Sequence, residues 1–235
     1  MRNAVVTMGA LLVIGCAHEA VGPAAGAASG RGADLRGAGS AQDAEAMDAS
    51  VDGLPSLIPE SVAPPAPRWG DPVDYNALRE AYGPRADFDA RCDATVQQSV
   101  ARALAEERFE DVIELTQRPL ERCPVFAQLH LWRALALLDL GRTVEADVHR
   151  AWFLGLTQSV LDSGDGQTPE TPYVTIAVWE EYATLMRLGL EPRGQVLLDG
   201  PRMLDVLSAE DEEGNARSLY FDPQWHFIRL MHRLQ

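Results

Sequence analysis

The position of the aromatic residues most constrains what this chain can fold into. No Phe, Trp or Tyr precedes Trp69, and residues 17–68 are dominated by Ala, Gly, Pro and Ser. Such a composition cannot bury enough apolar surface to offset the entropy that a chain loses on folding. We therefore expect a disordered tether over residues 16–68 and one globular domain over residues 69–235.

The first sixteen residues have the features of an export signal. Arg2 gives a positive start, and the apolar run at 4–15 is too short to span a membrane. The run ends in VIGC (13–16), which resembles the bacterial lipobox. The resemblance implies that residues 1–15 are a signal peptide and that Cys16 becomes an acylated N-terminus. The alternative is an ordinary cleaved signal followed by an unrelated cysteine.

The tether and its first residue predict where the protein resides. Several acyl chains would hold Cys16 stably on a membrane. A flexible coil as long as residues 17–68 reaches about 40 Å, which is enough to hold a domain clear of the lipid. Ala17 stands where the sorting rule of enteric bacteria places Asp in inner-membrane lipoproteins. This favours the outer membrane, on its periplasmic or its surface side.

Charge and overall composition exclude two classes of partner. The formal net charge is -15, with 20 Lys and Arg against 35 Asp and Glu. Nucleic-acid binding needs clustered cations for the phosphates, and a polybasic membrane patch needs them for anionic lipids. Neither is expected, and the partners we predict are the membrane, through the lipid anchor, and other envelope proteins.

Apolar residues recur at helical spacing through the first half of the domain. A short helix is predicted from Asp74, followed by a hairpin whose arms cover 96–104 and 109–120. The segment 126–140 is apolar nearly all round, which predicts a helix buried on every side. A fourth arm is predicted over 144–156, after the turn at Gly141.

The two hairpins are related by a spacing of 34 residues. The segment that begins at Glu107 corresponds to the one that begins at Gly141, and Pro124 closes the first unit. This pattern resembles the tetratricopeptide repeat, in which a Gly turn and a closing Pro recur. Glu107 departs from it by replacing the usual Gly, and Pro119 is expected to interrupt the second arm. We read two degenerate repeats that form a scaffold.

Cys92 and Cys123 lie symmetrically about the turn near Glu107. Antiparallel arms would bring the two thiols together, and an exported protein meets an oxidising compartment. A disulfide is therefore predicted, with two buried free cysteines as the alternative. Neither cysteine belongs to a CxxC motif, and the sequence predicts no metal and no cofactor.

The last third of the chain changes character. A Gly-rich loop at 161–166 precedes short strands that are predicted near 173–176, 195–198, 203–208 and 217–221. A helix is predicted between the first two strands, and another begins after Asp222 and Pro223. The predicted fold class is α+β, mainly α. Repeat-like helical hairpins are followed by a small antiparallel β-sheet and a C-terminal helix.

Three stretches resemble an uncharacterised family of secreted bacterial proteins and lipoproteins, one of the domains of unknown function. They are DYNALREAYG (74–83), HRAWFLGLTQSVLDSGDGQTPETPYVTIAVWEEY (149–182), and GLEPRGQVLLDG with RSLYFDP (189–223). Their most distinctive parts are SGDG, EEY and YFD. The resemblance implies a periplasmic or surface-exposed domain, and it implies no activity.

Three residues in or beside these stretches are candidates for catalysis. His149, Asp165 and Glu181, together with the neighbouring Glu180, could converge as an acid–base group. In the alternative, Asp165 caps the backbone of its loop and His149 is a satisfied polar residue. Calcium at Asp162, Asp165 and Glu170 is a further option, although the EF-hand pattern fails. The other histidines, His18, His130, His226 and His232, have no metal-ligand spacing.

Two classes of function remain. The first is a lipid-anchored, non-catalytic module of the cell envelope that uses its hairpins for interaction or structure. The second is an envelope hydrolase or metal-dependent enzyme that uses the loop around Asp165 with His149 and Glu181. We expect the first, because it needs no convergent side chains and because no nucleophile motif such as GxSxG is present.

Overall fold

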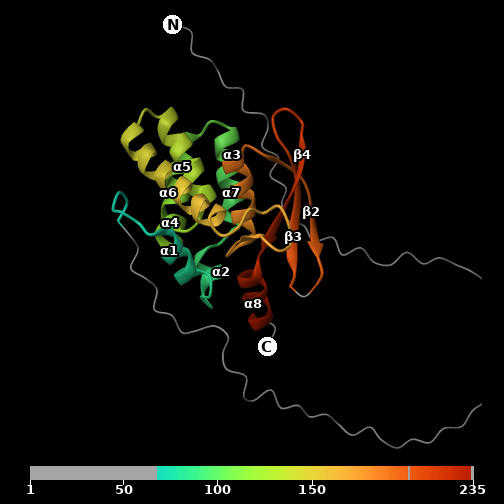
Figure 1. Ribbon diagram of the computed structural model, residues 1–235. Coiled ribbons are helices and arrows are strands. Elements are labelled where there is room, and N and C mark those ends of the chain that lie inside the picture. The colour runs from blue at the N-terminus through green and yellow to red at the C-terminus, as the bar shows by residue number, and fades with distance from the viewer. Residues whose placement is uncertain (1–67, 201, 234–235) are drawn as a thin grey trace, which may run out of the picture. The chain divides into compact units, whose positions relative to one another are not determined.

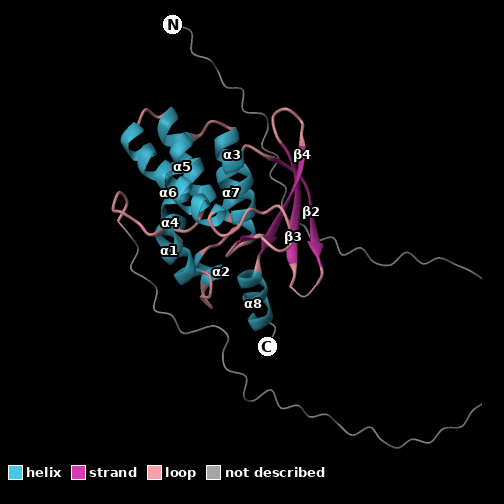
Figure 2. Cartoon of the chain, in the orientation of Figure 1, coloured by secondary structure: helices cyan, strands magenta, loops and turns pink. Residues whose placement is uncertain are grey.

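The computed structural model describes residues 68–200 and 202–233. Within them, most helices lie to one side of a four-stranded sheet, and a last helix follows the sheet (Figure 1, Figure 2). The predicted fold class is thereby confirmed. The predicted signal peptide, Cys16 and the tether up to residue 67 lie outside the described residues. No helix in the described ranges is long and apolar enough to cross a membrane.

The elements follow the predicted order, with the addition of one short helix, α2 (Phe88–Arg91), that was not predicted. The helices are α1 (Tyr75–Tyr82), α2 (Phe88–Arg91), α3 (Val96–Ala105), α4 (Phe109–Arg122), α5 (Ala127–Asp139), α6 (Thr143–Leu161), α7 (Val178–Leu188) and α8 (Gln224–Arg233). The strands are β1 (Tyr173–Val174), β2 (Glu191–Leu198), β3 (Leu204–Glu210) and β4 (Ala216–Asp222). Local chemistry sets several ends. Asp74 accepts a hydrogen bond from the amide of Ala77 at the start of α1, and Gly189 ends α7 with a φ of +69°.

The turns inside the two helical hairpins have the same conformation, 34 residues apart. Glu107 and Gly141 both have positive φ, at +54° and +72°. The next amide in each turn bonds the carbonyl five residues back, from Arg108 to Ala103 and from Arg142 to Leu137, each at 2.8 Å. The conformation thus recurs although only one of the two turns contains glycine.

Pro119 does not interrupt the second arm of the first hairpin, and this detail of the prediction was wrong. Helix α4 continues through it to Arg122. Proline has no backbone N–H to donate to the carbonyl of the preceding helical turn, and its presence inside a helix therefore usually kinks or breaks that helix. Here Leu120 and Cys123 are fully buried just beyond the proline, and that packing holds the helical path.

Two clusters of apolar side chains make the core. The larger one lies among the helices and includes Trp132, Trp152 and Trp179. Helix α5 runs through its middle, as its apolar surface predicts. The smaller cluster joins α6 and α7 to the sheet through Leu185, Leu207 and other residues. Helix α7 contributes to both clusters and therefore links the helices to the sheet.

The sheet has the strand order β1-β4-β3-β2. The three longer strands are antiparallel neighbours, as predicted, and β1 adds to β4 in parallel. The parallel pairing was not predicted. The chain passes through α7, β2 and β3 before it returns as β4, so the turn chemistry that identifies a hairpin is missing between β1 and β4.

The structure joins Cys92 and Cys123 in a disulfide, as the sequence predicts. The bond links the end of α2 to the end of α4, at the open end of the first hairpin. Both residues belong to the buried helical cluster, so the crosslink is enclosed in the core.

Candidate functional site

The three candidate residues are held by different sets of neighbours. His149 lies on α6, Asp165 in the loop between α6 and β1, and Glu181 on α7. Two hollows run along α4, and none of the three candidates lines either of them. Their lining residues are charged or polar for the most part and include Arg108, Asp111, Glu114, Arg118 and Glu121.

His149 belongs to a continuous chain of hydrogen bonds. His130 Nε2 lies 2.9 Å from the carbonyl oxygen of Pro124, which only accepts, so this nitrogen carries the proton. His130 Nδ1 must then accept from His149 Nδ1, at 2.9 Å. His149 Nε2 in turn accepts from Arg133 Nε at 3.0 Å. Both rings are thus neutral, and each ring nitrogen has a partner.

Burial keeps these two imidazoles neutral. It lowers the pKa of His130 well below its ordinary value, and the nearby His149 adds to the effect. Burial lowers the pKa of His149 to about 4, with a further contribution from Arg133. The rings of Trp69 and Trp152 close around the pair, with Trp152 stacked on His130 at 5.0 Å. To act as a base, His149 would have to give up its bond from Arg133.

Asp165 organises its own loop. Its Oδ1 accepts from the amide of Gln167 at 2.9 Å and from the hydroxyl of Thr171 at 2.6 Å. These two bonds hold the pKa of this exposed carboxyl below its ordinary value. The carboxylate therefore fills the capping role that the sequence offers as the alternative to catalysis.

The glycines of SGDG are required by close packing. A side chain at Gly164 would collide with the backbone of Pro172, and one at Gly166 would collide with the ring of Tyr173. The carbonyl of Gly166 also accepts from the amide of Tyr220 at 2.9 Å, which ties the loop to β4. Within the residues that the structure describes, no group of three or more His, Cys, Asp or Glu side chains is placed to hold a metal ion.

The first Glu of the EEY motif forms a buried ion pair with Arg79. Arg79 Nε and one terminal nitrogen donate to the two carboxylate oxygens of Glu180, at 2.9 and 2.8 Å. The same guanidinium donates to Ser159 Oγ and to the carbonyl of Val174. All of the chain's basic residues are Arg, and the planar fork of Arg suits such two-pronged contacts. One side chain thus joins α1, α6, β1 and α7.

The second Glu of the motif forms a buried carboxyl pair. Glu181 is fully buried and lies close enough to Asp205 of β3 to influence the pKa of that carboxyl. Two carboxyl groups can share a hydrogen bond only if one of them is protonated. Burial raises the pKa of Asp205, against the opposing effects of Gln195 and Glu181. Tyr182, the last residue of the motif, donates to Gln195 at 2.8 Å.

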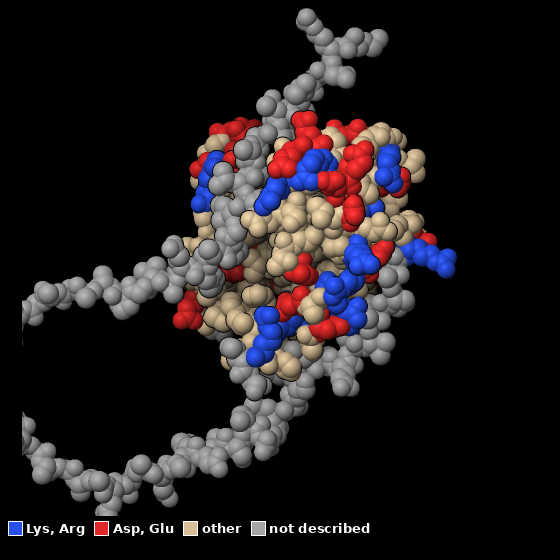
Figure 3. All heavy atoms as spheres, turned by 180° about the vertical axis from the view of Figure 1, so that it is seen from behind, with Lys and Arg blue, Asp and Glu red and all other residues tan. Residues whose placement is uncertain are grey.

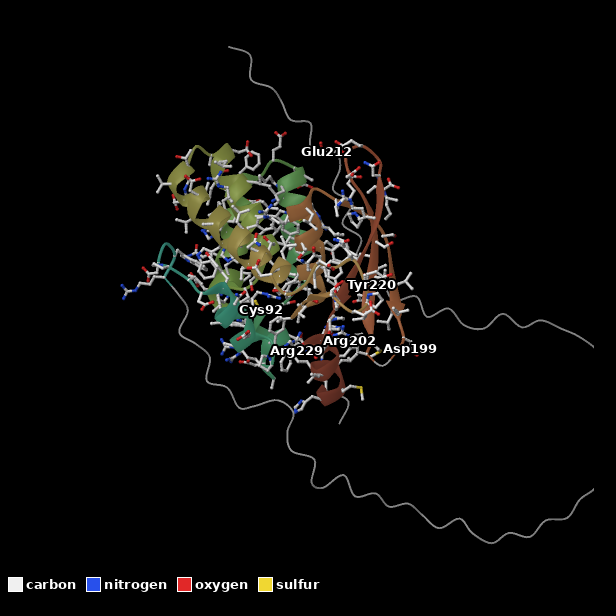
Figure 4. The ribbon with its side chains drawn as sticks, viewed as in Figure 1. Cys92, Asp199, Arg202, Glu212, Tyr220 and Arg229 are labelled. Atoms are coloured by element: carbon white, nitrogen blue, oxygen red, sulfur yellow. A yellow bond between two sulfur atoms is a disulfide. The ribbon has the colours of Figure 1, made fainter. Side chains whose placement is uncertain are left out.

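A buried cation fixes the C-terminal helix. Arg229 of α8 donates to the carbonyls of Gly83 and Ile176, at 2.5 and 2.6 Å, and its guanidinium lies 4.0 Å from the centre of the Phe88 ring. Burial lowers the pKa of Arg229 to about 10, which leaves it charged at neutral pH. Figure 4 shows Arg229 between α8 and the helices at the start of the domain.

The YFD motif also serves the fold. Asp222 accepts from the amide of Gln224 at the start of α8 and from Arg202 at 3.1 Å. Arg202 in turn donates to the carbonyl of Pro169, beyond the SGDG loop. Surface charges are similarly mixed, since blue and red side chains lie beside each other over much of the face in Figure 3.

Sequence reasoning missed the partners of the candidates. His130 has no metal-ligand spacing to another residue, yet His130 and His149 lie on the two arms of the second hairpin, on either side of the turn at Gly141. Asp205 offered a second signal, because it occupies a position on the same face of β3 as the buried Leu207. Arg79 and Arg229 gave no such signal, since their partners come from segments distant in sequence.

Comparison with known proteins identifies the family and no further relative. The model of a domain of unknown function, DUF4919, matches residues 76–227. No curated protein and no solved structure matches the chain. The family match spans every described helix and strand except the first residue of α1 and the part of α8 after residue 227. This chain therefore belongs to the DUF4919 family of domains of unknown function.

Proposed function

We propose that this protein is a lipid-anchored protein of the cell envelope whose domain works by interaction or as a structural part, without catalysis. One observation supports the proposal most strongly: the distinctive polar residues of the family stretches are engaged in the fold. Glu180 binds Arg79, Asp165 caps its loop, and Asp222 caps α8. A site for chemistry would instead leave such groups directed at a substrate.

The two helical hairpins are the proposed docking surface. Their turns repeat at 34 residues with matching hydrogen bonds, which favours degenerate tetratricopeptide-like units. Leu138 and Val144 are exposed on either side of the second turn. Exposed apolar side chains at such a position are suited to contact with another envelope protein.

The anchor is proposed from the lipobox-like VIGC that ends at Cys16. Cells that express the full-length protein should incorporate an alkynyl fatty acid into the wild type and not into Cys16→Ser. Cys92→Ser is a matched control, because it removes a cysteine and leaves Cys16 in place. Equal labelling of the wild type and Cys16→Ser would refute the anchor. Fractionation of labelled membranes would then test the proposed outer-membrane location.

Full-length protein isolated from detergent-solubilised envelopes tests the interaction proposal. We expect Leu138→Glu with Val144→Glu to lose a partner that the wild type retains. The matched control Ser99→Glu, at an exposed position on α3, should keep that partner. Asp165→Asn should also keep it, because Asn retains most of the capping capacity. Loss of function in a stably folded Asp165→Asn protein would overturn the proposal.

The buried carboxyl pair favours the alternative, an envelope hydrolase or metal-dependent enzyme that uses Asp165, His149 and Glu181. Carboxyl groups with a raised pKa are frequent in catalytic sites, as they are in some structural networks. Glu181→Gln separates the two functions, because it keeps the shape and removes the acid. Complete loss of function at unchanged melting temperature would favour the enzyme, and retained function would favour the interaction module.

A further inference from the structure

Strand β2 is a free edge of the sheet. It stands last in the order β1-β4-β3-β2, and Figure 1 shows it on the side of the sheet away from the helices. Within the described residues, no strand pairs with its outer side. Its side chains are exposed along almost the whole strand, whereas those of its neighbour β3 are mostly buried.

The two halves of β2 differ in how they are protected. Pro192 and Arg193 occupy the first half, where a bulge interrupts the pairing and Arg193 binds Glu210 at 2.9 Å. Proline, bulges and charges are the usual devices that prevent one edge strand from pairing with another. The second half, Gln195–Leu198, has none of them, and Val196, Leu197 and Leu198 are 68%, 48% and 41% exposed.

The opposite edge of the sheet cannot receive β2 from another copy. Strand β1 has only two residues, and the carbonyl of Val174 in it already accepts from Arg79 at 2.8 Å. Head-to-tail pairing, which would extend into a fibre, is therefore blocked. Pairing of β2 with β2 of a second copy uses the same surface twice and closes after two chains.

The charges around β2 select one register for such a pair. Side chains alternate between the two faces of a strand. In a pair of β2 strands related by a twofold axis perpendicular to the sheet, the same face of both copies is therefore aligned only if one residue lies opposite its own copy. Arg193 and Asp199 lie three residues before and after Val196. An axis at Val196 brings the end of β2 that carries Arg193 in each copy beside Asp199 of the other, although Arg193 sits at the bulge and also binds Glu210 and Glu191 of its own chain. It also sets Leu198 opposite Gly194, which has no side chain to obstruct it.

The location also suits a chain with a net charge of -15. Two copies repel each other over most surfaces that they could share. The segment Gln195–Leu198 contains no charge, and the ends of the pairing bring together opposite charges. Asp199 lies at the end of the β2–β3 hairpin in Figure 4, where a second chain can reach it.

We propose that two copies of this chain pair through β2 in an antiparallel, twofold dimer centred on Val196. The resulting sheet has eight strands, in the order β1-β4-β3-β2-β2-β3-β4-β1. The exposed apolar segment of β2, Gln195–Leu198, is thus covered by the same segment of a second copy. The proposal does not depend on the lipid anchor or on the hairpin docking surface, so each of the three can fail separately.

Cross-linking of the full-length protein carrying Cys16→Ser tests the pairing, because an unacylated Cys16 would itself react with the cross-linker. Val196→Cys, treated with a short bis-maleimide, should give a covalent dimer of twice the monomer mass. Ser99→Cys, at an exposed position on α3, is the control and should remain monomeric. Equal cross-linking of both variants, or cross-linking of Val196→Cys to a different protein, would overturn the proposal.

Charge exchange tests the register. Arg193→Asp should weaken the dimer about tenfold, as measured by sedimentation equilibrium in detergent, because two ion pairs become repulsive. Combining it with Asp199→Arg should restore the wild-type affinity. Val196→Lys should leave a folded monomer, since it places two ammonium groups face to face on the axis. An unaltered dimer in Val196→Lys, or no rescue in the double exchange, would refute the proposed interface.

Discussion

Two residues that differ in their tolerance of a left-handed conformation occupy equivalent turns. Glu107 and Gly141 both have positive φ, which costs a residue with a side chain about 1–2 kcal/mol and costs glycine almost nothing. The hydrogen bonds of the two turns are the same, so the difference between them is confined to one side chain. This pair offers an internally matched measure of the strain at Glu107.

Glu107→Gly should stabilise the domain by about 1 kcal/mol, because the gain from relieved strain exceeds the added freedom of the unfolded chain. The reverse change at the equivalent turn, Gly141→Ala, should destabilise it by a similar amount. Nothing lies within 4 Å of a side-chain carbon added at Gly141, so that loss would come from the backbone alone. Urea unfolding of both variants measures the two effects, and a destabilised Glu107→Gly would contradict the account.

The histidine pair predicts a loss of stability in acid. In the unfolded chain His149 titrates near its ordinary pKa of about 6.5, whereas in the folded chain its pKa is about 4. Between these two pKa values the unfolded chain binds more protons at His149 than the folded chain does. The contribution of His149 to the free energy of unfolding therefore rises with pH across this window and is constant above it. The contribution of His149 is about 3 kcal/mol. The raised pKa of Asp205 acts in the opposite direction and reduces the net change.

Unfolding by guanidinium at about pH 5 and about pH 7 measures this dependence. His149→Gln should show a smaller difference between the two conditions than the wild type, because the glutamine does not titrate. His232→Gln is a control on the exposed end of α8 and should leave the difference unchanged. Equal pH dependence in wild type and His149→Gln would show that the buried pair does not carry the effect.

At the scale of elements, long-range polar contacts determine how the helices meet the sheet. The sequence predicted the helices well, because their apolar spacing is local information. It did not predict that α4 continues through Pro119, since the packing around Leu120 decides that. It also could not pair His149 with His130 or Glu181 with Asp205, because the spacing within one element does not reveal contacts between elements. The catalytic grouping suggested from sequence likewise rested on residues that have separate partners.

The Arg79–Glu180 pair should be the most sensitive of these contacts. Glu180→Gln leaves the guanidinium of Arg79 buried without its counter-charge, and breaking a buried pair in this way costs about 3–5 kcal/mol. Arg79→Met combined with Glu180→Leu removes both charges and should recover much of the loss. Glu181→Gln is the matched control, because an amide can still donate to Asp205. Thermal melts that ranked Glu181→Gln below Glu180→Gln in stability would contradict this assignment.

At the scale of the whole molecule, helix α7 determines whether the domain unfolds in one step. It contributes Ala183 to the helical cluster and Leu185 to the cluster against the sheet. The EEY motif near its start adds the ion pair to α1 and the carboxyl pair to β3. Neither cluster can lose α7 without exposing the other, so we expect both to unfold together.

Reduction of the disulfide tests this cooperativity. The bond closes a loop between residues 31 apart, which in the chain-entropy model is worth about 3.7 kcal/mol. If the domain unfolds as one unit, reduction should lower hydrogen-exchange protection by the same free energy in α4, beside the bond, and in β3, far from it in sequence. The variant Cys92→Ala with Cys123→Ala should match the reduced protein and be insensitive to reductant. Protection that fell in α4 and persisted in β3 would show instead that the sheet cluster remains folded when the hairpin opens.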